Sequence, residues 1–313
     1  MSGGSKVTVV GSFNMDLSVR TPRMPVPGET ILGGPFATGP GGKGANQAVA
    51  AARLGGDVTM LVKLGKDIFG DQAAQNLINE GVNPQYILRE DQSHTGVAFI
   101  IVDDKGENMI VVAGGANNNL TPADVEQARP AISSADVLLL QQEIPLETVG
   151  RALGIAGETG VKVVLNPAPG QRLSKELIKQ IDVLTPNETE AQLITGLPVG
   201  NLAQAEQAAN YLLDSGVGAV VITLGANGAL ITTSSGHHHI PGREVQVLDS
   251  TGAGDAFSGA LAVALAEGKD LVESAAFANA AAALQVTRPG TAPAMPYRDE
   301  VMAFLKSSKR YYD

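Results

Sequence analysis

The chain of 313 residues carries 22 Lys and Arg against 32 Asp and Glu, a formal net charge of −10, and has no cysteine. Disulfides, thiolate metal sites and cysteine nucleophiles are therefore excluded, and an acidic surface without basic runs disfavours nucleic acid as a partner. The length and the Ala- and Gly-rich composition suit one large α/β unit with a small appendage. The short polar N-terminus and the absence of an apolar stretch long enough to span a bilayer predict a cytoplasmic protein.

The first third of the chain mixes apolar segments with stretches rich in Pro and Gly. A buried strand is expected at 7–10, and residues 21–42 are expected to contain short extended pieces such as 29–32. The further elements expected here are a helix at 45–54, a strand at 58–64, a helix at 71–80, and β-rich segments at 95–102 and 108–113.

From residue 121 the pattern becomes regular. Thr121 and Pro122 are typical of a helix start, with the hydroxyl as N-cap and proline at the first helical position. Strands are expected at 137–140, 161–165, 183–184 and 219–223, with helical segments between them, then a β-rich stretch at 228–248 and helices at 253–266 and 271–286. Alternation of this kind predicts a mainly parallel sheet that helices cover on both faces.

Two early segments, 16–40 and 95–113, break this alternation because both look like strands without a helix to cover them. We expect them to pair into a small sheet that stands off the main domain and serves as a lid. No linker, internal repeat or low-complexity tract is evident, so residues 1–313 are interpreted as a single domain with this lid.

The first glycine-rich loop runs from Gly39 to Asn46 and leads into a helix. A Walker A loop is excluded, because Ala37 and Gly44 stand where that motif needs Gly and Ser or Thr. No Rossmann fingerprint follows the first strand either. The loop is either a flexible turn or a place where the backbone approaches a polar ligand closely, with Asn46 facing that ligand.

The second glycine-rich loop, Gly252-Ala253-Gly254, comes directly before Asp255 and a long helix. Successive N–H groups at a helix start, together with the helix dipole, favour an anion. Asp255 is either a helix cap or the group that faces a hydroxyl attacking a bound phosphate. A capping carboxylate would compete with phosphate for the same N–H groups, which favours the second interpretation.

The two loops, in this order and at this separation, resemble the signatures of the PfkB carbohydrate-kinase family. "GGKGANQAVAAARLG" is similar to its N-terminal signature and "DSTGAGDAFSGAL" to its C-terminal one, while Asn187 to Glu190 match its N-x-x-E element. The resemblance runs nearly end to end and includes "GSFNMD", "NPAP", "TPNETE", "ITLGANG" and "VTRPGT". Within the family, the chain is most similar to the members that phosphorylate ribose.

The resemblance implies a three-layer α/β/α sandwich with a mainly parallel central sheet, plus a small β-sheet lid that also forms the contact of a homodimer. It implies transfer of the ATP γ-phosphoryl group to the primary (O5) hydroxyl of D-ribose. Gly252, Ala253 and Gly254 would donate N–H groups to the phosphoryl oxygens, and Asp255 would accept the hydroxyl proton. The sugar would be held by Asn14, Asp16, Gly42, Lys43, Asn46, Glu143 and Asp255.

The resemblance also implies a site for ATP with Mg²⁺ and a monovalent cation. The ATP contacts would be Asn187, Thr223, Leu224, Gly225, Ala226, Asn227, Gly228, Gly254 and Asn279. Glu190 would hold Mg²⁺ through water. An activating K⁺ would be bound by Asp249 and by the carbonyls of Thr251, Gln285, Arg288 and Gly290. The chain departs from a common pattern at two positions, with Asn279 in place of histidine and Ala294 in place of serine.

Other functions stay open at the level of sequence. A kinase of the same family could act on deoxyribose, fructose or adenosine, and a non-catalytic sugar sensor could retain the fold. A nicotinamide dehydrogenase is disfavoured by the missing fingerprint. His237, His238 and His239 are expected on a surface hairpin rather than at a metal, because neighbouring strand residues point to alternate faces. His94 is expected to be solvated or to lie at a hinge of the lid.

Overall fold

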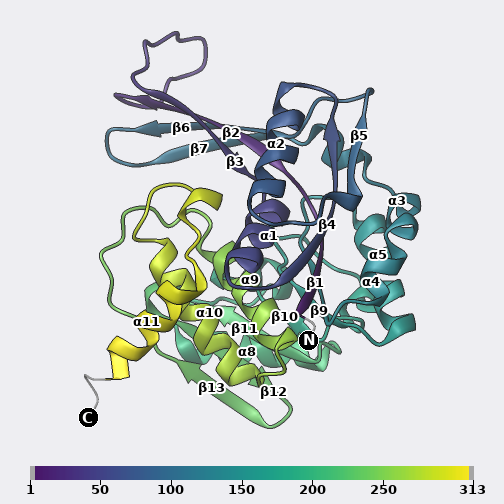
Figure 1. Ribbon diagram of the computed structural model, residues 1–313. Coiled ribbons are helices and arrows are strands. Elements are labelled where there is room, and N and C mark those ends of the chain that lie inside the picture. Colours follow the sequence, from purple (N-terminus) through teal and green to yellow (C-terminus); the bar gives the residue numbers. More distant parts are fainter. Residues whose placement is uncertain (1–3, 310–313) are drawn as a thin grey trace.

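The computed structural model describes residues 4–309, which form two β-sheets with helices packed around the larger one (Figure 1). The larger sheet has the order β13-β12-β11-β10-β9-β8-β1-β4-β5. Its strands are β1 (Lys6–Val10), β4 (Asp57–Gly65), β5 (Ile87–Glu90), β8 (Val137–Leu140), β9 (Lys162–Leu165), β10 (Val183–Leu184), β11 (Ala219–Thr223), β12 (Ala229–Thr233) and β13 (Gly236–Ile240). Only the β11-β12-β13 end is antiparallel, so the prediction of a mainly parallel sheet is confirmed.

Helices cover both faces of this sheet because its strand residues alternate between two cores. Val7 and Val9 of β1 belong to one core, and Val10 belongs to the other. The first core is covered by α1 (Lys43–Arg53), α2 (Ile68–Asn79), α9 (Ala253–Ala266), α10 (Leu271–Gln285) and α11 (Arg298–Lys309). The second is covered by α3 (Pro122–Gln127), α4 (Arg129–Ser133), α5 (Leu146–Thr159), α6 (Lys175–Ile178), α7 (Glu188–Thr195) and α8 (Leu202–Asp214). None of the helices within residues 4–309 is long and apolar enough to cross a membrane.

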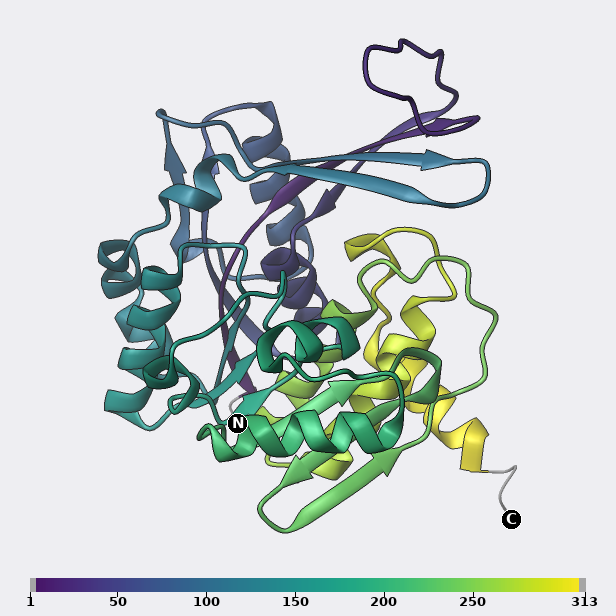
Figure 2. The same ribbon diagram turned by 180° about the vertical axis from the view of Figure 1, so that it is seen from behind.

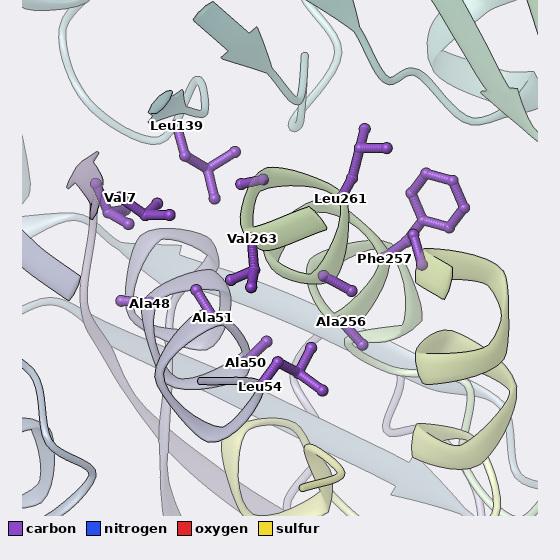
Figure 3. Packing of buried hydrophobic residues seen from close by; sticks show 14 of the residues in the cluster. Val7, Ala48, Ala50, Ala51, Leu54, Leu139, Ala256, Phe257, Leu261 and Val263 are labelled. Carbon is purple, nitrogen blue, oxygen red and sulfur yellow. The ribbon is translucent and has the colours of Figure 1, made fainter. Parts of the chain in front are cut away.

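Helices α1 and α9 lie side by side at the centre of the first core, where Figure 3 shows Ala50 and Ala51 facing Ala256 and Val263. The two helices approach so closely that a Cβ atom at Gly259 would lie 2.7 Å from the carbonyl oxygen of Gln47. Small residues on both helices make this contact possible. It brings the two glycine-rich loops, which precede these helices, to the same end of the sheet.

The smaller sheet has the order β3-β2-β6-β7 and projects away from the helices and the larger sheet (Figures 1 and 2). Its strands are β2 (Asn14–Thr21), β3 (Phe36–Gly41), β6 (Val97–Asp103) and β7 (Asn108–Ala113). The predicted pairing of the two early segments is therefore confirmed. Several apolar side chains of this sheet are exposed to solvent. Phe99 has 51% of its surface accessible and Val111 has 67%.

Some expected elements differ from the structure. Residues 29–32 form no strand, because the Pro- and Gly-rich segment between β2 and β3 is a loop in which Arg23 pairs with Glu29. The β-rich stretch expected at 228–248 ends as a strand at Ile240, and the chain then continues irregularly toward α9. Strand β5 was not expected, since its residues Ile87–Glu90 do not alternate clearly between apolar and polar.

Candidate active site

Asp255 lies in the first turn of α9 with only 5% of its surface accessible. Its Oδ2 accepts a hydrogen bond from Asn46 Nδ2 at 2.9 Å, and its Oδ1 accepts one from Gln47 Nε2 at 3.0 Å. Both donors belong to α1, so the carboxylate is oriented by the neighbouring helix. The structure therefore supports the interpretation in which Asp255 faces a ligand over the one in which it caps its own helix.

A cavity of about 200 Å³ opens directly beside this carboxylate. It is lined by the start of α9, from Gly252 to Asp255, and by two other parts of the chain, namely Lys43 at the start of α1 and Asn187 and Glu190 at the start of α7. Gly252 has φ 87°, a left-handed conformation that favours glycine, and it ends the irregular segment before the helix. A Cβ atom at Gly254 would meet no atom within 4 Å. The amide-bearing loop thus faces open space next to an acid, which is the arrangement that the sequence predicted.

The charges around the cavity alternate in sign. The Asp255 carboxylate, followed by those of Glu143 and Glu190, raises the pKa of Lys43 against the opposing effect of burial. Burial raises the pKa of Glu190, which Lys43 lowers again in part. An ammonium group and a helix N-terminus on one cavity can together balance the charge of a phosphate chain.

The polar residues at the root of the small sheet form a second cluster. Glu143 Oε2 accepts hydrogen bonds from the Ser12 hydroxyl (2.5 Å) and the Lys43 backbone N–H (2.9 Å), and Asn14 Nδ2 lies 3.5 Å away. Asn14 Oδ1 in turn accepts a bond from Asn117 Nδ2 at 2.9 Å. The cluster is therefore held by bonds within the protein, with carboxylates and amides that suit the hydroxyls of a sugar.

Asp16 adds a second acid to this cluster. Burial, with a smaller contribution from Glu143 and then Asp255, raises the pKa of Asp16 to about 7, although the Thr291 hydroxyl opposes the shift. Asp16 also lies against the first glycine-rich loop, where a Cβ atom at Gly41 would be 2.3 Å from its carboxylate oxygen. The acid and the loop are thus packed together without room for a larger residue.

A more apolar cavity of about 360 Å³ continues from the first, and both are lined by Ser250 and Ala253. Its walls are the loop at Gly225 and Ala226, the segment 242–247, and the α10 residues Asn279, Ala282, Ala283 and Val286. Its size and walls suit the base and ribose of a nucleotide, with the phosphates reaching the smaller cavity. Asn279 lines this cavity, and its Nδ2 donates to the carbonyl of Pro241 at 3.0 Å.

Of the loop predicted to bind nucleotide, Thr223 lines the smaller cavity and Gly225 and Ala226 line the larger one, whereas Leu224, Asn227 and Gly228 line neither. A Cβ atom at Gly228 would lie 2.0 Å from the carbonyl of Ile240, so glycine is required where the loop passes β13.

The residues His237 to His239 lie on β13 and are exposed, as predicted. One of them has a contact that the sequence did not suggest, because His239 Nε2 lies 2.8 Å from the carbonyl oxygen of Asn227 in the loop. His94 is exposed next to β6, and its Nδ1 lies 2.7 Å from the carbonyl of Thr95.

Sequence analysis missed several residues of the site. Gln47 contacts Asp255 and also Asn166 Oδ1 at 3.1 Å, yet in sequence it is one polar residue in an alanine-rich helix. Asn166 and Thr185 line the smaller cavity and fall in the "NPAP" and "TPNETE" segments, which were a usable signal. Residues 243–247 line the larger cavity, but they form neither a helix nor a strand, so no periodic pattern in the sequence indicated their role.

The residues expected to bind metals fall into two groups. Glu190 Oε2 accepts the Asn187 N–H at 2.9 Å and Asn187 Oδ1 accepts the Glu190 N–H at 2.8 Å, a capping box that fixes both side chains on the cavity wall. Their oxygen donors fit Mg²⁺ bound to nucleotide phosphates. Asp249, Thr251, Gln285 and Gly290 are brought together through hydrogen bonds, and the backbone N–H of Arg288 donates to the Gln285 carbonyl at 3.1 Å. Residues 4–309 contain no cluster of three or more His, Asp or Glu side chains suited to a metal.

The chain is similar to known carbohydrate kinases over nearly its whole length. Residues 5–298 match the model of the pfkB family carbohydrate kinases. Ribokinase of Haemophilus influenzae is 44% identical over 300 residues, covering 96% of this chain and 98% of that protein. Deoxyribokinase of Salmonella typhi is 38% identical over 300 residues, covering 96% and 98%. The structure of Arabidopsis thaliana ribokinase complexed with ribose and ATP superposes with a TM-score of 0.92 at 35% identity, covering 97% of this chain and 99% of that chain.

Proposed function

The chain belongs to the pfkB family of carbohydrate kinases, and we propose from its site that it transfers the γ-phosphoryl group of ATP to the primary (O5) hydroxyl of D-ribose. The products are ribose 5-phosphate and ADP. The single observation that carries this proposal is the position of Asp255, buried at the helix start and oriented by Asn46 and Gln47 toward a cavity lined by Gly252 to Gly254.

The sugar is held between the small sheet and α1 in this proposal. Asn14, Asp16, Asn46 and Glu143 pair its hydroxyls, while Gly42 and Lys43 bring the backbone close to it. These groups hydrogen-bond partly to each other without sugar, and a ligand lacking the matching hydroxyls would leave buried polar atoms unpaired. The oxygen atom Oδ1 of Asn46 is one such buried atom, without a partner among the described residues.

The chemical step needs little from the protein beyond position and charge. The O5 atom attacks the γ-phosphorus in line with the bond to ADP, which breaks as the new bond forms, and the hydroxyl proton passes to Asp255. The N–H groups of residues 252–254 stabilise the charge on the transferring oxygens. Mg²⁺, held through Glu190 and water, would neutralise the phosphate chain when ATP is bound. The larger cavity receives the rest of the nucleotide, next to Asn279.

The small sheet acts as the lid in this proposal and also as the contact of a homodimer. Its exposed residues Phe99, Met109 and Val111 give an apolar surface that a second copy would cover, while Asp16 and Asn14 at its root reach the sugar. Closure of the lid excludes water and limits ATP hydrolysis.

A cytoplasmic location and activation by K⁺ stay predictions. The contacts of Gln285 bear on the prediction of K⁺ activation.

Deoxyribose is a second candidate substrate, because the deoxyribokinase of Salmonella typhi is 38% identical to the chain. The 44% identity to a ribokinase favours ribose. A coupled assay of ADP release with ribose, deoxyribose, fructose and adenosine decides between them. We expect the highest kcat/KM with ribose, and a higher value with deoxyribose would reverse the assignment. A protein that releases no ADP with any sugar would be a sensor.

The proposal is tested by the substitution Asp255→Asn. The amide keeps the size of the side chain but cannot take up the proton, so kcat falls by about 10³-fold, while the melting temperature and the affinity for ATP change little. The matched control is Asp270→Asn, in which the N-cap acid of α10 (2.8 Å from the Glu273 N–H) becomes an equally good cap outside both cavities. Near-normal turnover in Asp255→Asn would rule out the assigned role.

A further inference from the structure

Two chain segments, 249–251 and 285–290, meet immediately before the anion-facing loop, where two hydrogen bonds join them and two more lie within them. Asp249 accepts bonds from the backbone N–H groups of Thr251 and Gly290, both at 2.9 Å. Gln285 Nε2 donates to the carbonyl oxygens of the same two residues, at 2.7 Å for Thr251 and 3.0 Å for Gly290. One acid and one amide therefore clamp the same two residues, the acid through their N–H groups and the amide through their carbonyl oxygens.

This clamp sits where the resemblance implied a monovalent cation. The implied ligands include the carbonyls of Thr251 and Gly290, which already accept the amide of Gln285, and the carbonyl of Gln285, which accepts the Arg288 N–H at 3.1 Å. A cation bound by Thr251 and Gly290 would have to displace that amide. Ala294 is buried and offers no side-chain oxygen. The residues present fit an internal amide better than a cation.

The orientation of the amide follows from its surroundings. The Gln285 side chain is fully buried, and its Oε1 has no hydrogen-bond partner among the described residues. Turning the amide over would place Oε1 against two carbonyl oxygens, three acceptors without a donor between them. Both hydrogen bonds of Nε2 would be lost as well. Without a cation, the observed orientation is therefore the stable one.

The clamp is connected to both halves of the active site. Gly252, the first residue of the anion-facing loop, packs against Thr291, whose Cα would lie 3.4 Å from a Cβ atom added to that glycine. The Thr291 hydroxyl donates to the carbonyl of Pro40 at 3.1 Å, in the first glycine-rich loop. A shift of the segment around Gly290 would thus move the N–H groups that face the phosphate.

We propose that the side-chain amide of Gln285 takes the place of a monovalent cation in this chain. It ties Thr251 to Gly290 and so keeps the N–H groups of residues 252–254 in position without K⁺. Gln285 is a positioning residue, since it acts through the loop and touches neither substrate. The inference rests on the proposed phosphoryl transfer.

The test compares the wild-type protein with Gln285→Ala and Gln285→Met in KCl and in tetramethylammonium chloride at equal ionic strength. The first readout is kcat with ribose and Mg²⁺-ATP, and the second is the melting temperature of the ADP complex. We expect wild-type values to agree between the two salts. Gln285→Ala should lose at least about tenfold in kcat without K⁺, because the loop is misplaced, and K⁺ should restore much of it.

The two variants separate loss of the donor from loss of volume. Gln285→Ala leaves room for K⁺, so KCl should also raise its melting temperature, whereas Gln285→Met fills the space without an N–H group and should lose activity in both salts. Gln180→Ala, which removes an exposed side-chain bond to the carbonyl of Glu176, is the matched control and should behave as wild type.

Two outcomes would overturn the proposal. The first is a wild-type protein that K⁺ activates and stabilises specifically, which would mean that the amide turns over and offers Oε1 to the ion. The second is a Gln285→Ala or Gln285→Met variant with wild-type kcat and melting temperature without K⁺. A wild-type protein that releases no ADP with any sugar would contradict the proposed function instead, and the melting temperatures would still report on the clamp.

Discussion

A Cβ atom added at Gly42, in the first glycine-rich loop, would lie 2.5 Å from the backbone nitrogen of Asn14, whereas one added at Gly254, in the second loop, would meet no atom within 4 Å. Gly42 also has φ 88°, and Gly254 is helical. The first loop therefore needs glycine so that the protein can pack against itself, and the second needs it so that space is left for a ligand. In the proposed mechanism, glycine is required for the fold in the first loop and for catalysis in the second.

Gly42→Ala tests the first half of this comparison and should have the largest effect. The substitution forces a side chain into a left-handed conformation against the backbone of Phe13 and Asn14, so the free energy of unfolding should fall by about 3 kcal/mol. Urea unfolding measures it. Gly39→Ala, in the same loop but with open space around it, should change stability little. Equal effects of the two substitutions would break the comparison.

Gly254→Ala tests the second half. Alanine is a better helix former than glycine and meets no clash, so stability should be maintained or rise slightly. Its methyl group would enter the cavity beside the N–H groups, and kcat should fall about a hundredfold, comparable to loss of an oxyanion-hole donor. The measurements are kcat and the urea midpoint. A destabilised protein, or an unchanged kcat, would show that the two loops do not differ as described.

Asp16 extends the comparison of the two loops to the residues that would hold the sugar. Its pKa of about 7 means that the carboxyl changes its charge in the neutral pH range in which activity is measured. The ionised form accepts bonds from sugar hydroxyls, so kcat/KM for sugar should fall about tenfold from pH 8 to pH 6, and Asp16→Asn should flatten that profile. Stability without sugar should change in the opposite direction. Burial raises the pKa of the Asp16 carboxyl from its ordinary value of 3.8 to about 7 in the folded protein. The group therefore contributes stability that is fully present below pH 4 and is lost as the pH rises through 7.

His239→Ala should have the smallest effect, at the outer edge of the nucleotide side. The substitution removes the 2.8 Å contact with the carbonyl of Asn227 but leaves the nucleotide loop otherwise intact. The KM for ATP should rise about twofold with kcat unchanged, in line with one exposed hydrogen bond. His238→Ala, its exposed neighbour, is the control. An equal rise in both variants would trace the effect to the hairpin and not to this contact.

The sequence predicted most of the fold because β/α alternation and hydrophobic periodicity are local signals. The helix before β4 was expected at 45–54 and occurs at Lys43–Arg53, and the small sheet was expected from two segments that lacked covering helices. The parts of the site that lie in motifs, such as Asp255 and Asn187, were also predicted. Gln47, the 243–247 wall and the amide of Gln285 were not, because their roles depend on contacts between residues tens to hundreds of positions apart. The Gln47–Asp255 bond, for example, spans 208 positions.

The same long-range contact has a consequence for how activity arises in the cell. The donors Asn46 and Gln47 are synthesised early, and Asp255 belongs to one of the last helices, so the acid cannot be oriented until α9 has packed against α1. Contacts between such distant parts of a chain form late and slowly in folding. A nascent chain that lacks α9 has neither Asp255 nor the N–H groups of residues 252–254, so in the proposed mechanism it cannot transfer phosphate until that helix has been made.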